Sequence, residues 1–132
     1  MELKLGMLVG IMWGAFSLAI GGIDTPIKAL CILITIDFIT GIAAGYKTDS
    51  LSSKCGSKGL FKKIGIFIAI MLAYVVDCAM ATNMLRGMVI SGFAIIEAMS
   101  IVENTDRMGY GFLIPDFLRS KLIQIADEKK IK

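Results

Sequence analysis

Four long apolar runs, three of which contain a single acidic residue, constrain the fold of this chain more than any other feature. The run without a charge is Leu5–Ile23, and the others are Ala29–Tyr46 with Asp37, Ile64–Leu85 with Asp77, and Gly87–Val102 with Glu97. A helix needs about 20 residues to cross a bilayer core of about 30 Å, so the first three runs are long enough to span. Hydrophobic residues make up 56% of the chain, above the roughly 45–50% of ordinary globular chains, and a bilayer is the natural solvent for the excess.

The fourth run is shorter, with 16 residues, or about 24 Å at 1.5 Å per residue. We therefore predict an all-α, single membrane domain with four transmembrane helices; the alternative is three such helices and one interfacial helix. Residues 116–132 are expected to form an amphipathic C-terminal tail, with Leu118, Leu122 and Ile125 on one face. That helix would either pack on its neighbours or lie on the inner membrane surface.

The distribution of basic residues predicts the topology. The segment 47–63 is a basic loop with five lysines: Lys47, Lys54, Lys58, Lys62 and Lys63. The positive-inside rule places this loop in the cytoplasm, and with four spans both termini are then cytoplasmic. Twelve of the 14 Lys and Arg residues would lie inside. The same lysines could bind anionic lipid head groups. Leu5–Ile23 follows a single basic residue, Lys4, and is expected to be a retained signal anchor rather than a cleaved peptide.

The three acids inside the runs make their helices marginal in lipid. An aspartate at the centre of a span costs about 2.5–3.5 kcal/mol, and each Leu, Ile, Phe or Val returns about 0.3–0.6 kcal/mol. The run Ala29–Tyr46 has eight such apolar residues, a gain of roughly 2.4–4.8 kcal/mol that barely offsets Asp37. Asp37, Asp77 and Glu97 therefore need partner helices, water or protonation. They would either line a hydrated lumen or respond to membrane voltage, or they would be protonated or hydrogen-bonded between helices and fix the packing.

Small residues recur at a spacing typical of close helix contacts. The residues concerned are Gly6, Gly10 and Gly14 in the first run, Gly41 and Gly45 in the second, and Ala69 and Ala73 in the third. Glycine and alanine four residues apart let two helix backbones approach closely in lipid. We expect these positions to pack helices, either within one bundle or between copies of the chain.

The chain lacks the patterns that enzymes and metal sites use. It has no histidine, and its three cysteines, Cys31, Cys55 and Cys78, are widely spaced. A disulfide framework and a zinc site are therefore not expected. Phosphate-loop, dinucleotide and nucleophile-elbow motifs do not occur. A net charge of +3 does not argue for nucleic acid. We predict a non-enzymatic protein without catalytic residues, a cofactor or a metal.

Several ordered motifs resemble one family. They are Asp37–Gly41 near the end of a run, Leu51–Lys54 and Gly59–Lys63 in the basic loop, Glu97–Asn104 across the end of the fourth run, and Gly109 with Ile114-Pro115 after it. Over roughly residues 24–122 the chain resembles the bacteriophage lysis holin family, which also includes clostridial toxin-secretion holins. The four predicted spans exceed the one to three that are usual for holins.

The resemblance implies a function and a location. Such proteins accumulate in the bacterial cytoplasmic membrane as homo-oligomers and then form lesions that release an endolysin or a large toxin. The expected partners are membrane lipid and other copies of the chain, with no stable contact to the released protein. Two other classes remain open from the residues alone: a small proton- or ion-coupled transporter that uses the intramembrane carboxylates, and a non-conducting membrane scaffold.

Overall fold

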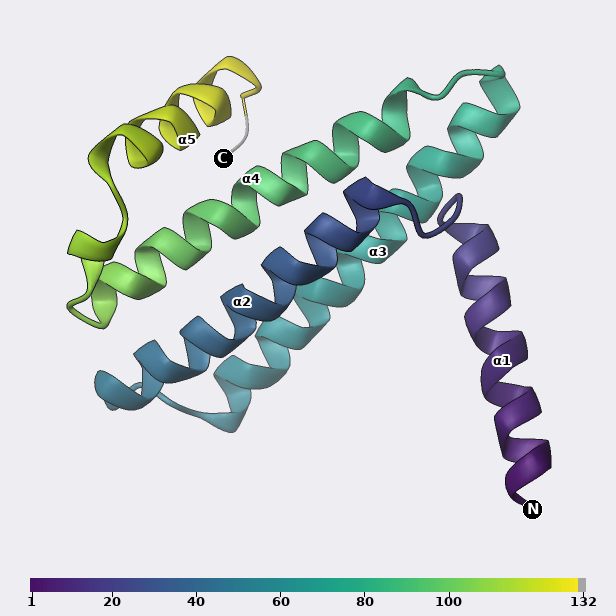
Figure 1. Cartoon of the computed structure of the whole chain (residues 1–132), viewed down its shortest axis with the longest axis horizontal. Helices are drawn as coiled ribbons and strands as arrows, with labels where there is room; N and C mark the ends of the chain where they lie inside the picture. Colours follow the sequence, from purple (N-terminus) through teal and green to yellow (C-terminus); the bar gives the residue numbers. More distant parts are fainter. Residues whose placement is uncertain (131–132) are drawn as a thin grey trace.

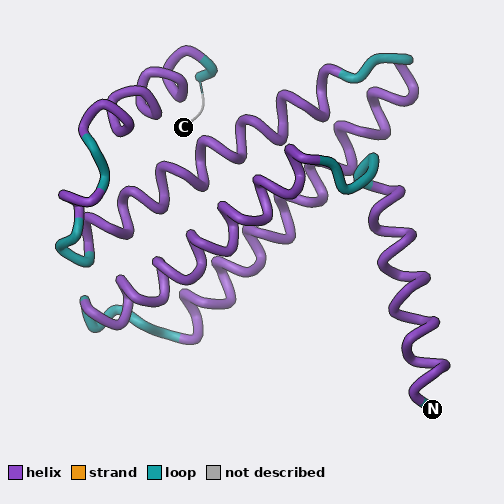
Figure 2. The backbone as a smooth tube through the Cα atoms, viewed as in Figure 1, coloured by secondary structure: helices purple, strands orange, loops and turns teal. Residues whose placement is uncertain are grey.

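The computed structural model describes residues 1–130 and is helical throughout this range apart from short connections (Figures 1 and 2). In chain order the elements are α1 (Glu2–Ala19), α2 (Thr25–Lys47), α3 (Ser53–Met80), α4 (Met84–Arg107), a 3-10 turn (Gly111–Leu113) and α5 (Asp116–Glu128). Helices α1 to α4 are each long and apolar enough to cross a membrane. The prediction of an all-α fold with four membrane-spanning helices is confirmed.

Two helices extend well beyond the apolar runs that predicted them. Helix α4 has 24 residues, or about 36 Å, so the expected shortage of length in this segment does not arise. Helix α3 begins at Ser53 rather than near Ile64, because the Ser52 side chain accepts a hydrogen bond from the backbone N–H of Cys55 and caps the helix. The segment 47–63 is therefore mostly helix, and the connection between α2 and α3 is residues 48–52. Residues 131 and 132 of the expected tail lie outside the described range.

Helix α4 is the centre of the molecule and packs against α2, α3 and α5. Helices α2 and α4 run in the same direction and α3 runs opposite to both, while α5 turns back along α4 (Figure 1). The fully apolar core lies at the end of this bundle where α2 begins. It consists of Ile20, Ile27, Leu30, Ile66, Ile70 and Ile90.

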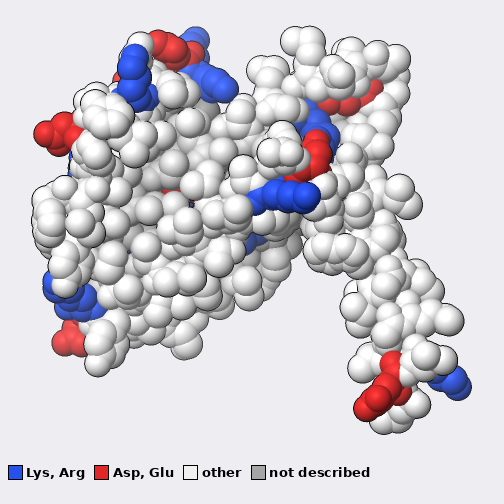
Figure 3. Space-filling view, in the orientation of Figure 1, with Lys and Arg blue, Asp and Glu red and all other residues white. Residues whose placement is uncertain are grey.

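Helix α1 stands apart from the other helices (Figure 1). None of its 18 residues is buried. On the face shown in Figure 3 its charged side chains lie at the N-terminal end, where Glu2 and Lys4 occur, and the rest of the helix is uncharged. Such a surface suits a helix surrounded by lipid or by another membrane helix.

Candidate functional site

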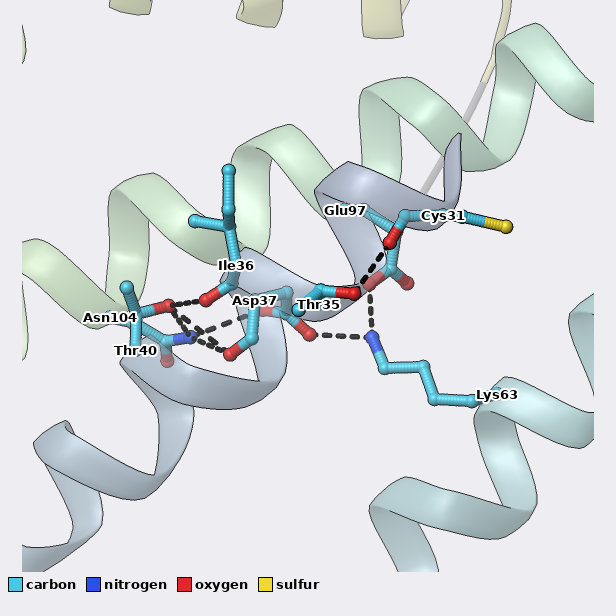
Figure 4. Close-up of polar contacts among 8 residues, drawn as sticks. All are labelled: Cys31, Thr35, Ile36, Asp37, Thr40, Lys63, Glu97 and Asn104. Carbon is cyan, nitrogen blue, oxygen red and sulfur yellow. Dashed lines mark hydrogen bonds and ion pairs between the residues drawn. The ribbon is translucent and has the colours of Figure 1, made fainter. Parts of the chain in front are cut away.

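Three charged side chains from three different helices meet inside the bundle (Figure 4). Lys63 on α3 donates a hydrogen bond to Asp37 on α2, with 2.5 Å between Nζ and Oδ2, and another to Oε2 of Glu97 on α4. The side chains of Lys63 and Asp37 are each 11% exposed and that of Glu97 is fully buried. We call Asp37, Lys63 and Glu97 the ion cluster.

Neutral polar groups complete the surroundings of Asp37. The Asn104 amide donates to Oδ1 of Asp37 and to the Thr40 hydroxyl, each at 3.1 Å. Thr40 in turn donates to the carbonyl oxygen of Ile36. A Cβ atom at Gly41 would lie 3.5 Å from the Asn104 amide nitrogen, so the missing side chain lets this amide lie directly against α2. By contrast, Oε1 of Glu97 has no hydrogen-bond partner among the described residues.

The ion cluster ties the three helices into one arrangement. Asp37 and Glu97 lie near the midpoints of α2 and α4, at the depth where a lipid environment is most apolar. Removing one partner of a buried ion pair typically costs about 3–5 kcal/mol, because the remaining charge loses its compensation. The helices α2, α3 and α4 are therefore held together by charge as well as by the apolar core.

A cavity of about 440 Å³ extends from the α2–α3 connection to the ion cluster. Ser50 and Ser52 line it at the connection, and Asp37, Lys63 and Asn104 line it at its inner end. Between these ends the wall includes Gly56 and Gly59 of α3, and a Cβ atom at either glycine would meet open space. The absence of side chains at these two positions leaves room for water along the path.

Asp77 lies apart from the ion cluster and caps a helix. Its carboxylate accepts hydrogen bonds from the Thr82 hydroxyl at 2.7 Å, from the Leu85 backbone N–H at 3.1 Å and from the Arg86 backbone N–H at 2.8 Å. These N–H groups belong to the first turn of α4, which has no intrahelical acceptors for them. Of the three acids that the sequence singled out, the structure thus brings Asp37 and Glu97 together and places Asp77 at a helix terminus.

Arg86 joins the α1–α2 connection to the start of α4. It donates to the carbonyl oxygens of Ile20 and Gly22 and forms an ion pair of 2.7 Å with Asp24. The hydrogen bond from Arg86 lowers the pKa of Asp24 below its usual value.

The turn between α1 and α2 requires glycine at position 21. At Gly21, φ is +81°, and a Cβ atom there would lie 2.6 Å from the ring of Tyr74. Only glycine fits this turn without a shift of its neighbours.

The small residues fall into two groups. In α2, Gly41 packs against Asn104 and Gly45 against Leu51, and in α3 Ala73 is buried; Ala69 in α3 is half-buried. In α1, a Cβ atom added at Gly6, Gly10 or Gly14 would have no described atom within 4 Å, so nothing within the described chain packs on these glycines. Gly41 therefore packs α2 against α4 within one copy, Gly45 packs against the α2–α3 connection, and the glycines of α1 do neither.

The lysines expected in a cytoplasmic loop have different surroundings. Lys54, Lys58 and Lys62 are exposed on α3, and Lys47 donates to the carbonyl oxygen of Met108 and lies over the Tyr110 ring. Lys63 points into the bundle, which its place in a basic segment did not predict. The available signal was periodicity, because Lys63 is the first member of a buried stripe along α3 that continues through Ile66, Ile70, Ala73 and Asp77.

Helix α5 lies along most of the length of α4. Near its start Arg119 forms an ion pair with Asp106 at 2.6 Å, and just after its end Lys129 donates to the Ser91 hydroxyl at 3.1 Å. Ala126 is buried between these contacts, and Leu122 and Ile125 are half-buried. Of the two arrangements expected for the tail, the structure has the one in which it packs on its neighbours.

Comparison with known proteins identifies the family. The sequence model of the bacteriophage holin family matches residues 14–127. The uncharacterized protein Lin0175 of Listeria innocua is 39% identical over 96% of this chain and 88% of its own length. The uncharacterized protein CPE0383 of Clostridium perfringens is 31% identical over 98% of this chain and 95% of its own length. No solved structure matches. The chain is a multi-pass membrane protein with a buried ion cluster, and it belongs to the bacteriophage holin family.

Proposed function

We propose that this protein oligomerises in the bacterial cytoplasmic membrane, with its N-terminus and the α2–α3 connection in the cytoplasm, and forms lesions through which an endolysin or a large toxin leaves the cell. One observation carries the proposal beyond family membership: α5 lies along α4, which is long and apolar enough to cross a membrane, and presents Lys121, Asp127 and Glu128 outward. This outward face requires water, and a lesion formed by several copies supplies it.

The outward face of α5 carries a polar stripe over the second half of the helix, while Phe117, Leu118 and Ile123 are exposed apolar residues of the same helix. Lys121 donates to Gln124 at 3.0 Å, and Gln124 donates to Glu128 at 2.8 Å, so the three side chains form a ladder on the exposed side of the helix. A lysine or aspartate facing lipid near the centre of a span costs about 2.5–3.5 kcal/mol. Lipid therefore does not suit this face, whereas a hydrated lumen or the polar face of another copy does.

The ion cluster suits a protein whose helices first pack in a closed arrangement and later separate. While α2, α3 and α4 stay together, Lys63 pairs with both carboxylates. Separation of the helices would expose these charges, which is favourable only next to water. The membrane potential contributes about 2.3 kcal/mol per charge per 100 mV, so several copies acting together could respond sharply to its collapse.

The direct test is to induce the protein in bacteria that hold an endolysin in the cytoplasm and to measure lysis. We expect abrupt lysis and release of cytoplasmic protein. A transporter would instead give flux of small ions without release of the endolysin, and that result would contradict the proposal.

A cysteine experiment tests the role of α5 in the same cells. Cys31, Cys55 and Cys78 are replaced by alanine, lysis by this variant is checked, and Gln124→Cys is then introduced. A charged, membrane-impermeant thiol reagent added outside should label this cysteine after lysis begins and not before. The matched control is Leu72→Cys, because Leu72 is 65% exposed on the apolar outer side of α3 and should face lipid throughout. Equal labelling at both positions would show that α5 does not line the water-filled path.

A further inference from the structure

The ion cluster contains more negative than positive groups. Asp37 and Glu97 supply two carboxylates and Lys63 supplies one ammonium group, so the cluster carries a net charge of −1 when all three are ionised. The charged residues that share the adjoining cavity are Lys62 and Arg107. Neither makes an ion pair with the two acids, and Arg107 instead donates to the Ser50 hydroxyl at 3.2 Å. A buried, uncompensated negative charge is strongly unfavourable at the centre of a membrane protein.

Oε1 of Glu97 is the position at which a positive charge is missing from the ion cluster. Oε1 of Glu97 is buried and has no hydrogen-bond partner among the described residues, although the other three carboxylate oxygens of the pair accept hydrogen bonds from Lys63 or Asn104. An ionised carboxylate in this position would leave an acceptor without a donor. A bound proton removes the excess charge.

We propose that Asp37 and Glu97 together bind one exchangeable proton, which enters and leaves through the cavity that opens at the α2–α3 connection. With the proton bound, the two acids carry a single negative charge that the Lys63 ammonium balances. The titratable groups in contact are Asp37 on α2, Lys63 on α3 and Glu97 on α4; Asn104 and Thr40 are the neutral groups beside them. This inference does not depend on lesion formation, because proton binding is a property of the closed bundle.

The route to the cluster explains why the proton can exchange. The cavity of about 440 Å³ reaches from Ser50 and Ser52 to Asp37 and Lys63. Figure 4 shows the Lys63 side chain reaching across from α3 to the two acids. The second cavity, of about 470 Å³ between α4 and α5, includes Lys62 and Glu103 but neither Asp37 nor Lys63. Exchange is therefore expected from the side of the α2–α3 connection.

Infrared spectroscopy of the full chain in lipid vesicles tests proton binding. We expect the C=O stretching band of a protonated carboxylic acid at neutral pH. The band should be lost in both Glu97→Gln and Asp37→Asn, because either change leaves one carboxylate balanced by Lys63. It should grow in Lys63→Met, because two carboxylates without a cation bind more protons. Asp77→Asn is the control and should retain the band, since Asp77 accepts three hydrogen bonds elsewhere.

Two outcomes would overturn the proposal. The first is a wild-type chain without the band at neutral pH, a result that needs no variant to fold. The second is a band lost in Glu97→Gln and retained in Asp37→Asn, because burial of Glu97 alone would then hold the proton.

A pair of glycine variants tests the route. Gly59→Leu places a side chain in the cavity, and Gly65→Leu places one on the exposed side of the same helix, outside the cavity. Transfer of the vesicles to D₂O shifts the carboxylic acid band as the proton exchanges. We expect slower exchange in Gly59→Leu and the wild-type rate in Gly65→Leu. Equal rates in all three proteins would show that the proton does not use this cavity.

Discussion

Helix α1 and the bundle of α2, α3 and α4 are both built from long apolar segments, yet only the bundle helices are packed along their length, whereas α1 touches the bundle near its C-terminal end through Phe16. Each bundle helix contributes one charged residue to the ion cluster, whereas the charges of α1 lie at its start, at Glu2 and Lys4. Apolar side chains gain little by leaving lipid for another apolar helix, so polar contacts and close packing decide which helices associate. Hydropathy predicts which helices enter the membrane, and the few polar residues predict which of these helices pack together.

Lys63→Met should cause the largest loss in the free energy of unfolding of the bundle. This change removes the cation and leaves Asp37 and Glu97 facing each other in the bundle, so we expect a loss of about 3–5 kcal/mol in the free energy of unfolding. The measurement is reversible unfolding in mixed micelles, followed by circular dichroism.

Lys62→Met is the matched control for that change. Lys62 is the preceding residue of the same helix and is exposed, so its replacement should alter the free energy of unfolding by less than about 0.5 kcal/mol. If both variants unfold like the wild type, the ion cluster does not hold the three helices together.

The sequence predicted the helices and the acids but not the partner of the acids. Lys63 precedes the apolar run Ile64–Leu85 and belongs to a basic segment, so charge counting assigned it to a loop. Its role depends on the start of α3 at Ser53, which a single serine cap sets. Burial of Lys63 follows from the helix phase set by Ile66 and Ile70, and this phase applies to Lys63 only because α3 extends back past Ile64.

The second prediction compares glycines of the two regions. Gly41→Leu would push a side chain into the Asn104 amide, 3.5 Å from the position of its Cβ atom, and should cost about 1–3 kcal/mol of unfolding free energy, as overpacking does. Gly10→Leu meets open space on α1 and should change the free energy of unfolding by less than about 0.5 kcal/mol. The same micelle assay measures both, and an equal loss in the two variants would mean that α1 is packed in the folded protein.

The third prediction concerns Asp77, which caps the start of α4. The sequence left open whether this acid lines a hydrated lumen or fixes the packing between helices. Asp77→Ala removes the acceptor for the N–H groups of Leu85 and Arg86. A lost N-terminal cap costs about 0.5–2 kcal/mol. We expect faster amide hydrogen exchange at these two residues, with exchange near Glu97 unchanged. Exchange that accelerates equally along the whole of α4 would show that Asp77 supports the bundle rather than the helix start.

The smallest effect is expected where α1 meets the bundle, at the ion pair of Asp24 and Arg86. The hydrogen bond from Arg86 lowers the pKa of Asp24 in the folded protein, so the pair stabilises the fold above the unfolded pKa of about 3.9. This contribution is lost as the pH falls through the lowered folded pKa. Because the Asp24 side chain is 45% exposed, screening by water limits it to less than about 1 kcal/mol.

Asp24→Asn isolates this contribution, because asparagine can still accept the hydrogen bond from the Ile27 N–H that caps α2. The free energy of unfolding is measured for both proteins from neutral pH downward. The wild type should be slightly more stable at neutral pH, and the difference should disappear in acid, since a protonated Asp24 no longer pairs with Arg86. A difference that stays constant as the pH falls would assign the effect of the substitution to packing. The junction between α1 and the bundle would then be held by the hydrogen bonds from Arg86 to the carbonyl oxygens of Ile20 and Gly22, which do not titrate.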